Sequence, residues 1–494
     1  MNLTGRLAAT PNDFVRREFL EPQFRHELEH LLPWYVLIEK ALLAEYHRLG
    51  VLSSGEVAGL TAGLRGLTRD SVDARADDSL TDIALAIEGQ VLSGSDPVPA
   101  WHVDRSRNDL QACAQLLHVR EQVTTVAGGF GRLAEVALRR AGEDVTSPMP
   151  GYTHLQAAQV VSPGFWLSAL ADHALATSSR LLTTYDRINL SPLGAGPMAG
   201  QELAWDRQLL AEAVGCTAPA PHALSAVASR SWLLDVAADL STAGVGLSRF
   251  HTDLMAWLSS AYGLVELPDD LAGISASMPQ KKNYPLLERL RGRTAHLVSF
   301  YVDLAAAQRN TAYSNSVEVS KEAGRHATTA FAEARAVVDG TTLVVDRLQW
   351  CVDTMRAWCE RDHFGFFSLA NQLTLRAGIP WRTSQVIAGR YVVAVLEQHD
   401  GRADAQLLGD LCRSTGHPLE GADSFLDASL DVDGQLASKV SSGGTGPDAV
   451  RALLDDQHER RATLDNEWAA RTSAVDAAVA RTDAVLDTLA GYRA

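Results

Sequence analysis

Apolar residues recur at helical spacing over most of the chain, and the strict alternation of a half-buried strand is nearly absent. Four long stretches carry this pattern: 109–140, 163–188, 225–262 and 286–348. Pro163 opens the second stretch, where a proline is tolerated because the first-turn N–H has no intrahelical partner. The pattern predicts an all-α protein.

The fourth stretch is the most informative for architecture. No proline lies between Pro285 and Pro380, and apolar positions continue from about 286 to about 348. A helical region of more than forty residues far exceeds the usual helix length. It needs partners along its whole run, so it predicts a helical bundle or the core of an oligomer.

Loops in the sequence give approximate domain boundaries. Gly-, Pro- and Ser-rich segments at 93–99 and 441–447, and the Phe-Gly-Phe-Phe run at 364–367, interrupt the helical pattern. We predict three domains: an N-terminal helical domain (1–103), a central long-helix domain (104–362) and a C-terminal helical domain with an extension (363–494). The extension, 448–489, reads as one or two amphipathic helices with no chemistry assigned.

Charge and composition narrow the possible classes of protein. The 494 residues carry a formal net charge of −16, which argues against a nucleic-acid or anionic-membrane surface. No uninterrupted apolar run approaches a membrane span, and the first residues lack an apolar signal core. Five scattered cysteines without a C-x-x-C pair predict reduced thiols in a cytoplasmic protein: Cys113, Cys216, Cys351, Cys359 and Cys412.

The segment from Ser275 to Asn283 concentrates reactive side chains. It holds a hydroxyl, the ammonium groups of Lys281 and Lys282, and an amide within nine residues. Two cations near a serine can hold a carboxylate while the proton on the adjacent carbon is removed. A lone Lys-Lys pair is usually a solvated basic turn, but here Gly-Ile-Ser-Ala-Ser precedes it and a helical stretch follows. We therefore favour a functional site.

Two further segments join a polar loop to a helix. Ser106, Arg107 and Asn108 stand at a predicted helix start, where backbone N–H groups bind anions; the alternative is ordinary capping. Thr153 and His154 lie in the segment Gly-Tyr-Thr-His-Leu-Gln. His154 has the chemistry to move a proton near neutral pH, although a single histidine is more often structural.

Two weaker signals remain. The segment 191–200 is rich in glycine, which permits close backbone approach but by itself predicts only a flexible loop. Tyr313 and Lys321 lie about two helical turns apart with Glu318 between them, so they can share one face. A solvated helical face is the alternative.

Together these segments resemble argininosuccinate lyase, of the fumarase/aspartase superfamily, from about Leu80 to about Arg390. Ser106–Asp109 looks like the family's Ser-Arg-Asn-Asp motif, and Tyr152–Gln156 like its Tyr-Thr-His-Leu-Gln. Ser191–Gly200 is similar to its Pro-Leu-Gly-Ser-Gly-Ala-Leu-Ala-Gly segment. Gly273–Asn283 looks like the signature Gly-Ser-Ser-x-Met-Pro-Gln-Lys-Lys-Asn. Several short motifs in the right order make the resemblance specific.

The resemblance implies a three-domain helical fold whose long central helices form the bundle of a homotetramer. Each active site then collects residues from three subunits. Family members cleave a C–N bond of an N-substituted aspartate, releasing fumarate and an amine, without a metal or organic cofactor. The implied partners are this small-molecule substrate, fumarate and further copies of the chain, with neither nucleic acid nor membrane.

Residue roles follow from the same resemblance. Counting back from Met278 makes Ser275 the general base, with Ile274 at the usual Gly position. His154 protonates the amine or organises charge. Lys281 and Asn283 stabilise the doubly charged intermediate. The implied substrate-binding residues are Ser106, Arg107, Asn108, Thr153, Arg230, Lys281, Asn283, Tyr313, Glu318 and Lys321.

The chain departs from the family on positions expected to face the amine. Ala84 replaces a His, Glu318 replaces a Gln, and His222 and Ser225 stand where Asn and Asp are usual. The expected Gly-Ser-x-Ala-His segment is not recognisable within 34–42. These changes spare the fumarate half and suggest a changed amine.

A diamino acid such as 2,3-diaminobutyrate or 2,3-diaminopropionate fits this pattern, as in lyase relatives from antibiotic pathways. The alternatives are argininosuccinate lyase proper, another reaction of the superfamily, and a non-catalytic, crystallin-like structural protein.

Overall fold

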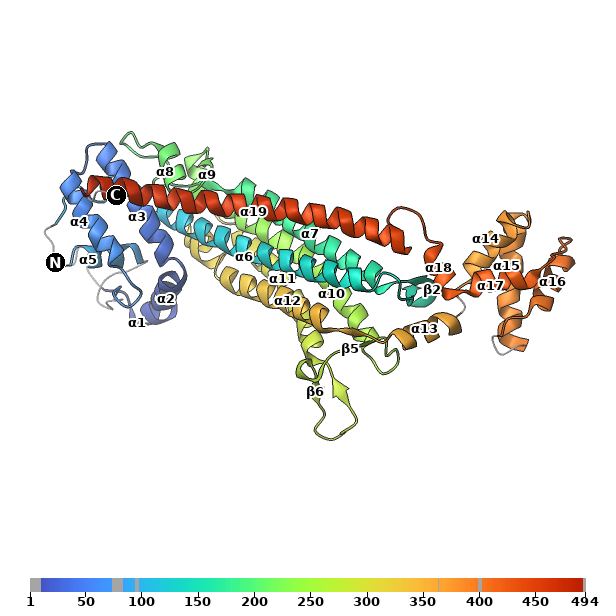
Figure 1. Ribbon diagram of the computed structural model, residues 1–494. Helices are drawn as coiled ribbons and strands as arrows, with labels where there is room; N and C mark the ends of the chain where they lie inside the picture. Colours follow the sequence, from blue (N-terminus) through green and yellow to red (C-terminus); the bar gives the residue numbers. More distant parts are fainter. Residues whose placement is uncertain (1–9, 73–82, 94–96, 363, 399–401, 492–494) are drawn as a thin grey trace.

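A computed structural model describes residues 10–72, 83–93, 97–362, 364–398 and 402–491. The described chain is elongated: small helices gather at each end of a long central bundle (Figure 1). The N-terminal end holds α1 (Asp13–Val15), the π-helical η1 (Arg16–Leu20), α2 (Glu21–His30), α3 (Leu32–Arg48), α4 (Ser54–Arg65) and α5 (Ile83–Val91).

The central bundle consists of α6 (Arg107–Glu143), α7 (Pro163–Ile188), α10 (Ser231–Trp257), α11 (Pro285–Gln308) and α12 (Ala327–Arg347). Their apolar faces meet in one continuous core that includes Phe130, Leu170 and Val337. Serine caps start the two first helices: Ser106 Oγ accepts from Asn108 N, and Ser162 Oγ accepts from Phe165 N. The all-α prediction is confirmed.

The remaining helices join and close these layers. They are α8 (Arg207–Ala213), α9 (Ala223–Ala228), η2 (Asp269–Leu271), η3 (Glu318–Glu322), α13 (Val352–Arg361), α14 (Phe366–Leu375), α15 (Trp381–Gln398), α16 (Ala405–Ser414), α17 (Ala422–Leu430), α18 (Val432–Ala437) and α19 (Pro447–Leu489). Helices α14 to α17 have their own apolar core at the end of the molecule opposite the N-terminal helices.

Strands occur only as short pairs within the described residues. The antiparallel pairs are β1 (Met149–Thr153) with β2 (Gln156–Val161), β5 (Val265–Glu266) with β8 (Gln349–Trp350), and β6 (Gly273–Ile274) with β7 (Lys282–Asn283). The parallel pair is β3 (Leu190–Ser191) with β4 (Ala218–Pro219).

Two predicted helical stretches are wrong in extent. The stretch 286–348 is two helices, because α11 ends at Gln308 and Asn310 adopts a left-handed φ of 60°. An asparagine in this conformation just past the last turn is a common helix stop. The stretch 225–262 is broken at Ser229, where the backbone is extended, so that α10 begins only at Ser231.

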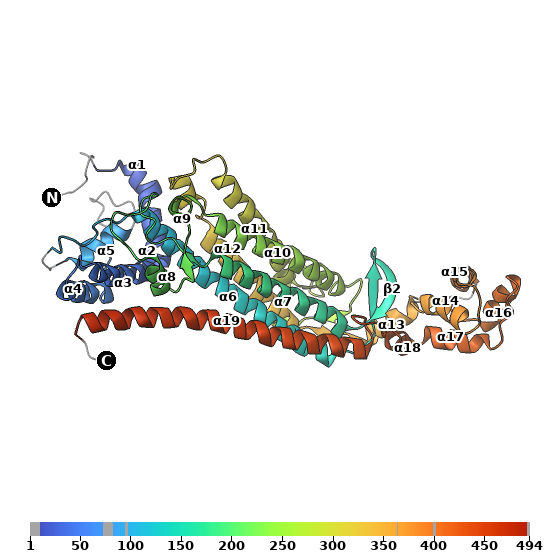
Figure 2. The same cartoon turned by 90° about the horizontal axis from the view of Figure 1, so that it is seen from above.

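The C-terminal extension forms one helix, α19, that runs back along the bundle to the N-terminal helices (Figure 2). It packs on α7 through Trp468, whose Nε1 donates to Ser178 Oγ at 3.0 Å and whose ring meets Tyr185 edge-on. The division at 103 and 362 stays a prediction, and α19 belongs structurally with the bundle it covers.

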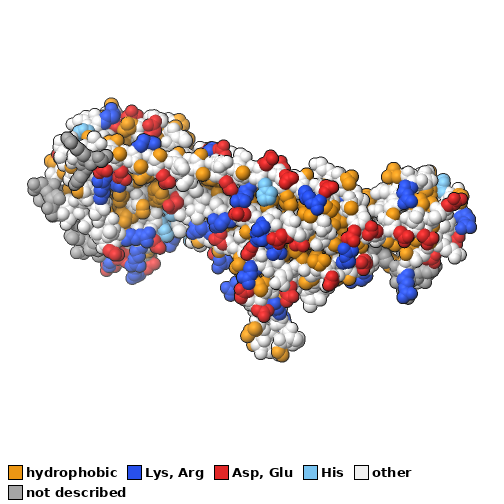
Figure 3. Space-filling view, in the orientation of Figure 1, with side chains coloured by type: hydrophobic (Ala, Val, Ile, Leu, Met, Phe, Trp, Pro, Cys, Tyr) orange, Lys and Arg blue, Asp and Glu red, His pale blue; other side chains and the backbone are white. Residues whose placement is uncertain are grey.

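No helix among the described residues combines the length and apolar character needed to cross a membrane. On the face shown in Figure 3, Lys, Arg, Asp and Glu side chains are interspersed along the bundle.

Candidate active site

The start of α6 places three predicted site residues at one end of the bundle. Ser106 caps the helix through a 3.1 Å bond from Asn108 N. The Asn108 side chain donates to the carbonyl of Pro197 at 3.0 Å, and Arg107 is exposed. These side chains and the N-terminal N–H groups of a 37-residue helix suit an anionic ligand.

A buried carboxylate holds the glycine-rich segment 191–200 in place, whereas the sequence by itself predicted only a flexible loop. Asp109 Oδ2 accepts from the backbone N–H of Gly194 at 3.1 Å and of Gly196 at 3.0 Å. Both glycines have positive φ, and a Cβ at Gly194 would lie 2.6 Å from Arg207 Cγ. Burial raises the pKa of Asp109 to about 7. The glycines are needed for this close approach to α6.

Asp109→Ala should therefore destabilise the fold more than Asp109→Asn. Alanine leaves two buried N–H groups without an acceptor, at about 1–3 kcal/mol each, whereas the asparagine oxygen still accepts them. We expect Asp109→Ala to lower the free energy of unfolding by about 2–6 kcal/mol and Asp109→Asn by less than about 1 kcal/mol. Urea unfolding measures both. Equal losses would contradict this role.

A buried ion pair that the sequence did not reveal anchors the same end. Arg105 binds Glu39 of α3 with both terminal nitrogens, and both side chains are almost fully buried. Burial raises the pKa of Glu39, but Arg105 outweighs it and lowers that pKa overall. The pair joins the N-terminal helices to the start of α6, directly before Ser106.

Lys321 and Arg230, both predicted to bind substrate, are engaged within the chain. Lys321 Nζ lies 2.9 Å from the buried carboxylate of Glu27 on α2. Arg230 is 1% exposed and donates from Nε to Gln115 Oε1 at 2.8 Å. Gln115 in turn donates to the carbonyl of Ser320 at 2.7 Å. This network joins α2, α6, α10 and η3.

Tyr313 and Glu318 lie on the surface, and Glu318 shares η3 with Lys321. The Tyr313 side chain is exposed, and its hydroxyl lies 3.2 Å from Ser225 Oγ. Glu318 is exposed in the first turn of η3; hydrogen bonds from its own backbone N–H and from Ser316 lower its pKa. Glu318 therefore offers a solvent-facing carboxylate. Ala84, at the position of the missing His, is buried in the core of the N-terminal end.

Thr153 and His154 lie at the tip of the β1–β2 hairpin. Thr153 pairs with Gln156, so that His154 and Leu155 form a two-residue turn with φ values of 54° and 60°. Such turns normally contain Gly or Asn, and each left-handed residue of another type costs about 1–2 kcal/mol. Strain of this kind clusters at functional sites. Thr153, His154 and Leu155 are all exposed.

Ser275 lies in the loop that joins β6 to β7. Its hydroxyl accepts from the backbone N–H of Met278 at 3.2 Å, which fixes the turn. Asn283 donates from its side chain to the carbonyl of Ile274 at 3.4 Å across the hairpin. The hairpin projects from the side of the bundle (Figure 1), and Ile274 is 94% exposed.

The two adjacent lysines have different surroundings. Lys282 Nζ is bound to Asp269 at 2.9 Å, to Glu266 at 3.3 Å and to the carbonyl of Leu267 at 2.7 Å. Lys281 is exposed and has no ion pair with any described residue. Lys282 therefore anchors the hairpin, and Lys281 keeps its charge available to a ligand.

The predicted site residues form three groups that one chain does not bring together. The first group, 106–108, lies at the start of α6, and the second, 153–154, follows the end of this 37-residue helix, which spans about 55 Å. The third group, 275–283, lies in the β6–β7 hairpin before α11, whose 24 residues span about 36 Å before the chain reaches Tyr313. The β1–β2 and β6–β7 hairpins also project in different directions (Figures 1 and 2).

No three His, Cys, Asp or Glu side chains in the described ranges are placed to hold a metal ion. The five cysteines lie in the described residues and form no disulfide with one another: Cys113, Cys216, Cys351, Cys359 and Cys412.

This helical bundle with polar hairpins is the fold of the fumarase/aspartase superfamily. A solved EDDS lyase variant with bound fumarate superposes with a TM-score of 0.85 at 22% identity, covering 98% of this chain and 97% of that chain. A class II fumarase from Schistosoma mansoni gives a TM-score of 0.65 at 16% identity over 85% and 95% of the two chains. At these identities the likeness shows the fold alone.

Sequence comparison gives the family. The lyase family model matches residues 71–298. Argininosuccinate lyase of Koribacter versatilis (strain Ellin345) is 30% identical over 413 residues, which cover 82% of this chain and 86% of that protein. The chain belongs to the argininosuccinate lyase family, which confirms the resemblance seen in its motifs. It is a carbon–nitrogen lyase of the fumarate-releasing type.

Proposed function

We propose that the protein cleaves an N-substituted aspartate by β-elimination, giving fumarate and a free amine. The observation that carries this proposal is that one hairpin loop holds the hydroxyl of Ser275 and the ammonium of Lys281, which makes no ion pair with a described residue. A neighbouring cation lowers the pKa of a hydroxyl, which makes a serine base feasible when the loop is closed.

In the proposed reaction Ser275 Oγ takes the proton from the carbon beside a substrate carboxylate. The electron pair moves into the carboxylate to give a doubly charged intermediate, which Lys281 and Asn283 stabilise. As the pair returns to form the C=C bond, the C–N bond breaks and the amine leaves. His154 protonates the amine or organises charge, while Ser106, Arg107, Asn108 and Thr153 bind the succinyl part.

We propose further that each site is built from three copies of a homotetramer. The length of α6 between the first and second residue groups, and the different directions in which the β1–β2 and β6–β7 hairpins project, support this assembly. Ile274, on a projecting hairpin, supports the assembly as well. Its side chain is 94% exposed, and covering this apolar surface with a partner copy is favourable.

For the amine half we propose a diamino acid, such as 2,3-diaminobutyrate or 2,3-diaminopropionate. The exposed carboxylate of Glu318 favours an ammonium group, and Glu318 lies in η3 with Lys321. Argininosuccinate is the alternative substrate, which the overall identity to argininosuccinate lyases favours. A non-catalytic, crystallin-like protein is the alternative of another class.

The test is fumarate release, followed by ultraviolet absorbance, from the aspartate adducts of both diamino acids and from argininosuccinate. We expect kcat/KM to be highest for a diamino-acid adduct, with Glu318→Gln narrowing the difference by about tenfold or more because a charged hydrogen bond is lost. The highest kcat/KM for argininosuccinate would overturn the diamino-acid proposal. No turnover of any adduct would overturn the lyase function.

A further inference from the structure

A cavity of about 480 Å³ lies beside the Lys321 network, between α2, α6, α10 and η3. Gln111, Gln115 and His118 of α6 line it, one to three turns beyond Asn108. Its size is within the range of pockets that hold small organic ligands. The residues proposed to bind the succinyl part are not among those that line the cavity: Ser106, Arg107, Asn108 and Thr153.

Arg230 forms part of the wall and lacks a counter-anion among the described residues. The guanidinium donates only to neutral acceptors among the described residues: Gln115 Oε1 and the carbonyls of Val227 and Ser229. Its Nη2 has no partner within the described chain. Burial lowers the pKa of Arg230 to about 10, so the guanidinium is still charged at neutral pH. A buried charge without an opposite charge is costly.

His118 gives a second unpartnered polar group in the same wall. It is 8% exposed, and neither ring nitrogen has a partner within the described chain. Burial lowers the pKa of His118 to about 4, so the ring is neutral and has one N–H to donate. Lys321 adds no net charge, because Glu27 pairs with it. Glu322 and Arg325 also line the cavity and pair with each other at 3.6 Å, and Glu18 pairs with Arg17 at 2.7 Å. Among the described lining residues, the guanidinium of Arg230 is therefore the charge without a counter-ion.

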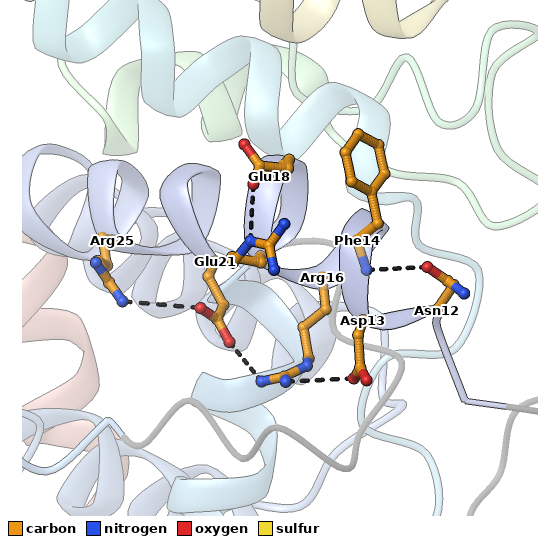
Figure 4. A network of polar contacts seen from close by, with 8 residues as sticks. Asn12, Asp13, Phe14, Arg16, Glu18, Glu21 and Arg25 are labelled. Carbon is orange, nitrogen blue, oxygen red and sulfur yellow. Dashed lines mark hydrogen bonds and ion pairs between the residues drawn. The ribbon is translucent and has the colours of Figure 1, made fainter.

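The rest of the lining is mostly apolar. Side chains from η1, α2, α6, α10 and the η3 region cover it, namely Phe19, Leu20, Leu31, Val119, Trp232, Leu233, Val317 and Val319. The outer wall is the η1–α2 segment, which ion pairs from Arg16 to Asp13 and Glu21 hold together at the surface (Figure 4). An apolar cavity with one buried cation suits an apolar molecule with one negative group.

We propose that this cavity binds a small carboxylate with an apolar body, whose carboxylate pairs with Arg230 Nη2. The neutral His118 ring donates a second hydrogen bond. The ligand is either the amine half of the substrate, if that amine carries its own carboxylate, or a separate effector. Its binding does not depend on turnover, so failure of this inference and failure of the proposed lyase reaction are distinguishable.

Calorimetric titration of the full-length protein with 3-phenylpropionate and with its neutral amide, 3-phenylpropanamide, tests the site. A charge-assisted hydrogen bond gives the carboxylate at least about tenfold tighter binding than the amide. Equal affinity, or no binding of either compound, would overturn the proposal.

Two variants locate the site. Arg230→Met removes the cation and should abolish the preference for the carboxylate. Thr328→Trp, at the wall, should fill the cavity and abolish binding of both compounds, whereas Thr329→Trp on the exposed side of α12 should not. If Arg230→Met does not fold, the two threonine variants still test whether the compounds bind in this cavity. Unchanged binding in Thr328→Trp would contradict the location.

Titration of 3-phenylpropionate in the presence of a saturating concentration of the free amine of the best substrate separates the two sources. A rise in Kd shows that the ligand overlaps the site of the amine half and supports that source. An unchanged Kd supports a separate effector.

Discussion

Ser275→Ala should lower the kcat of fumarate release by about 10²–10⁴-fold, the usual contribution of a general base. KM should change little, because the hydroxyl acts on a proton and does not hold the substrate. The folded state should be almost unaffected, since the hydroxyl accepts only one hydrogen bond, from Met278 N, in a partly exposed loop. Steady-state kinetics and the thermal unfolding midpoint measure these effects.

Ser277→Ala is the matched control. Ser277 is exposed in the same loop, two residues after Ser275, and it makes no hydrogen bond to another described residue. Its kcat should stay within about twofold of the wild type, because surface changes of this kind shift free energies by less than about 0.5 kcal/mol. A larger loss in Ser277→Ala than in Ser275→Ala would move the base to Ser277.

Lys281→Met should lower kcat by about 10²-fold, equivalent to about 3 kcal/mol, because one fixed donor to the developing charge is lost. The unfolding midpoint should not fall, since Lys281 makes no ion pair within the described chain. Lys282→Met is the control. It removes the contacts to Asp269 and Glu266 and should loosen the hairpin while lowering kcat less. The reverse order of kcat losses would contradict the assignment.

Much of the fold was predictable because helical periodicity and helix starts are local signals. Pro163 and Ser162 mark the start of α7 in the sequence itself, and its observed end at Ile188 agrees with the prediction. The break after Gln308 was missed because neither Gly nor Pro marks it. The polar run Ser314-Asn315-Ser316 was a usable signal that the apolar periodicity on both sides obscured.

The site was predictable as motifs but not as geometry. Lys281 and Lys282 are equivalent in sequence, and only the fold shows that acidic residues at 266 and 269 engage the second. Lys321 and Glu27 are 294 residues apart, so no local pattern pairs them. The roles of Arg105 and Asp109 likewise depend on Glu39 and on the loop at 194, which only the folded chain brings near.

The central claim is that residues of separate copies complete one another's sites, and mixing two inactive variants tests it most directly. Differently tagged Ser275→Ala and Asn108→Ala chains are co-expressed, and the mixed assemblies are purified through both tags. With equal random mixing in a symmetric oligomer, about one quarter of the sites draw both intact residues from different copies. The account predicts about that share of wild-type activity, and no recovery for Ser275→Ala with Lys281→Met, which lie in one hairpin. No recovery for the first pair, or equal recovery for both pairs, would contradict it.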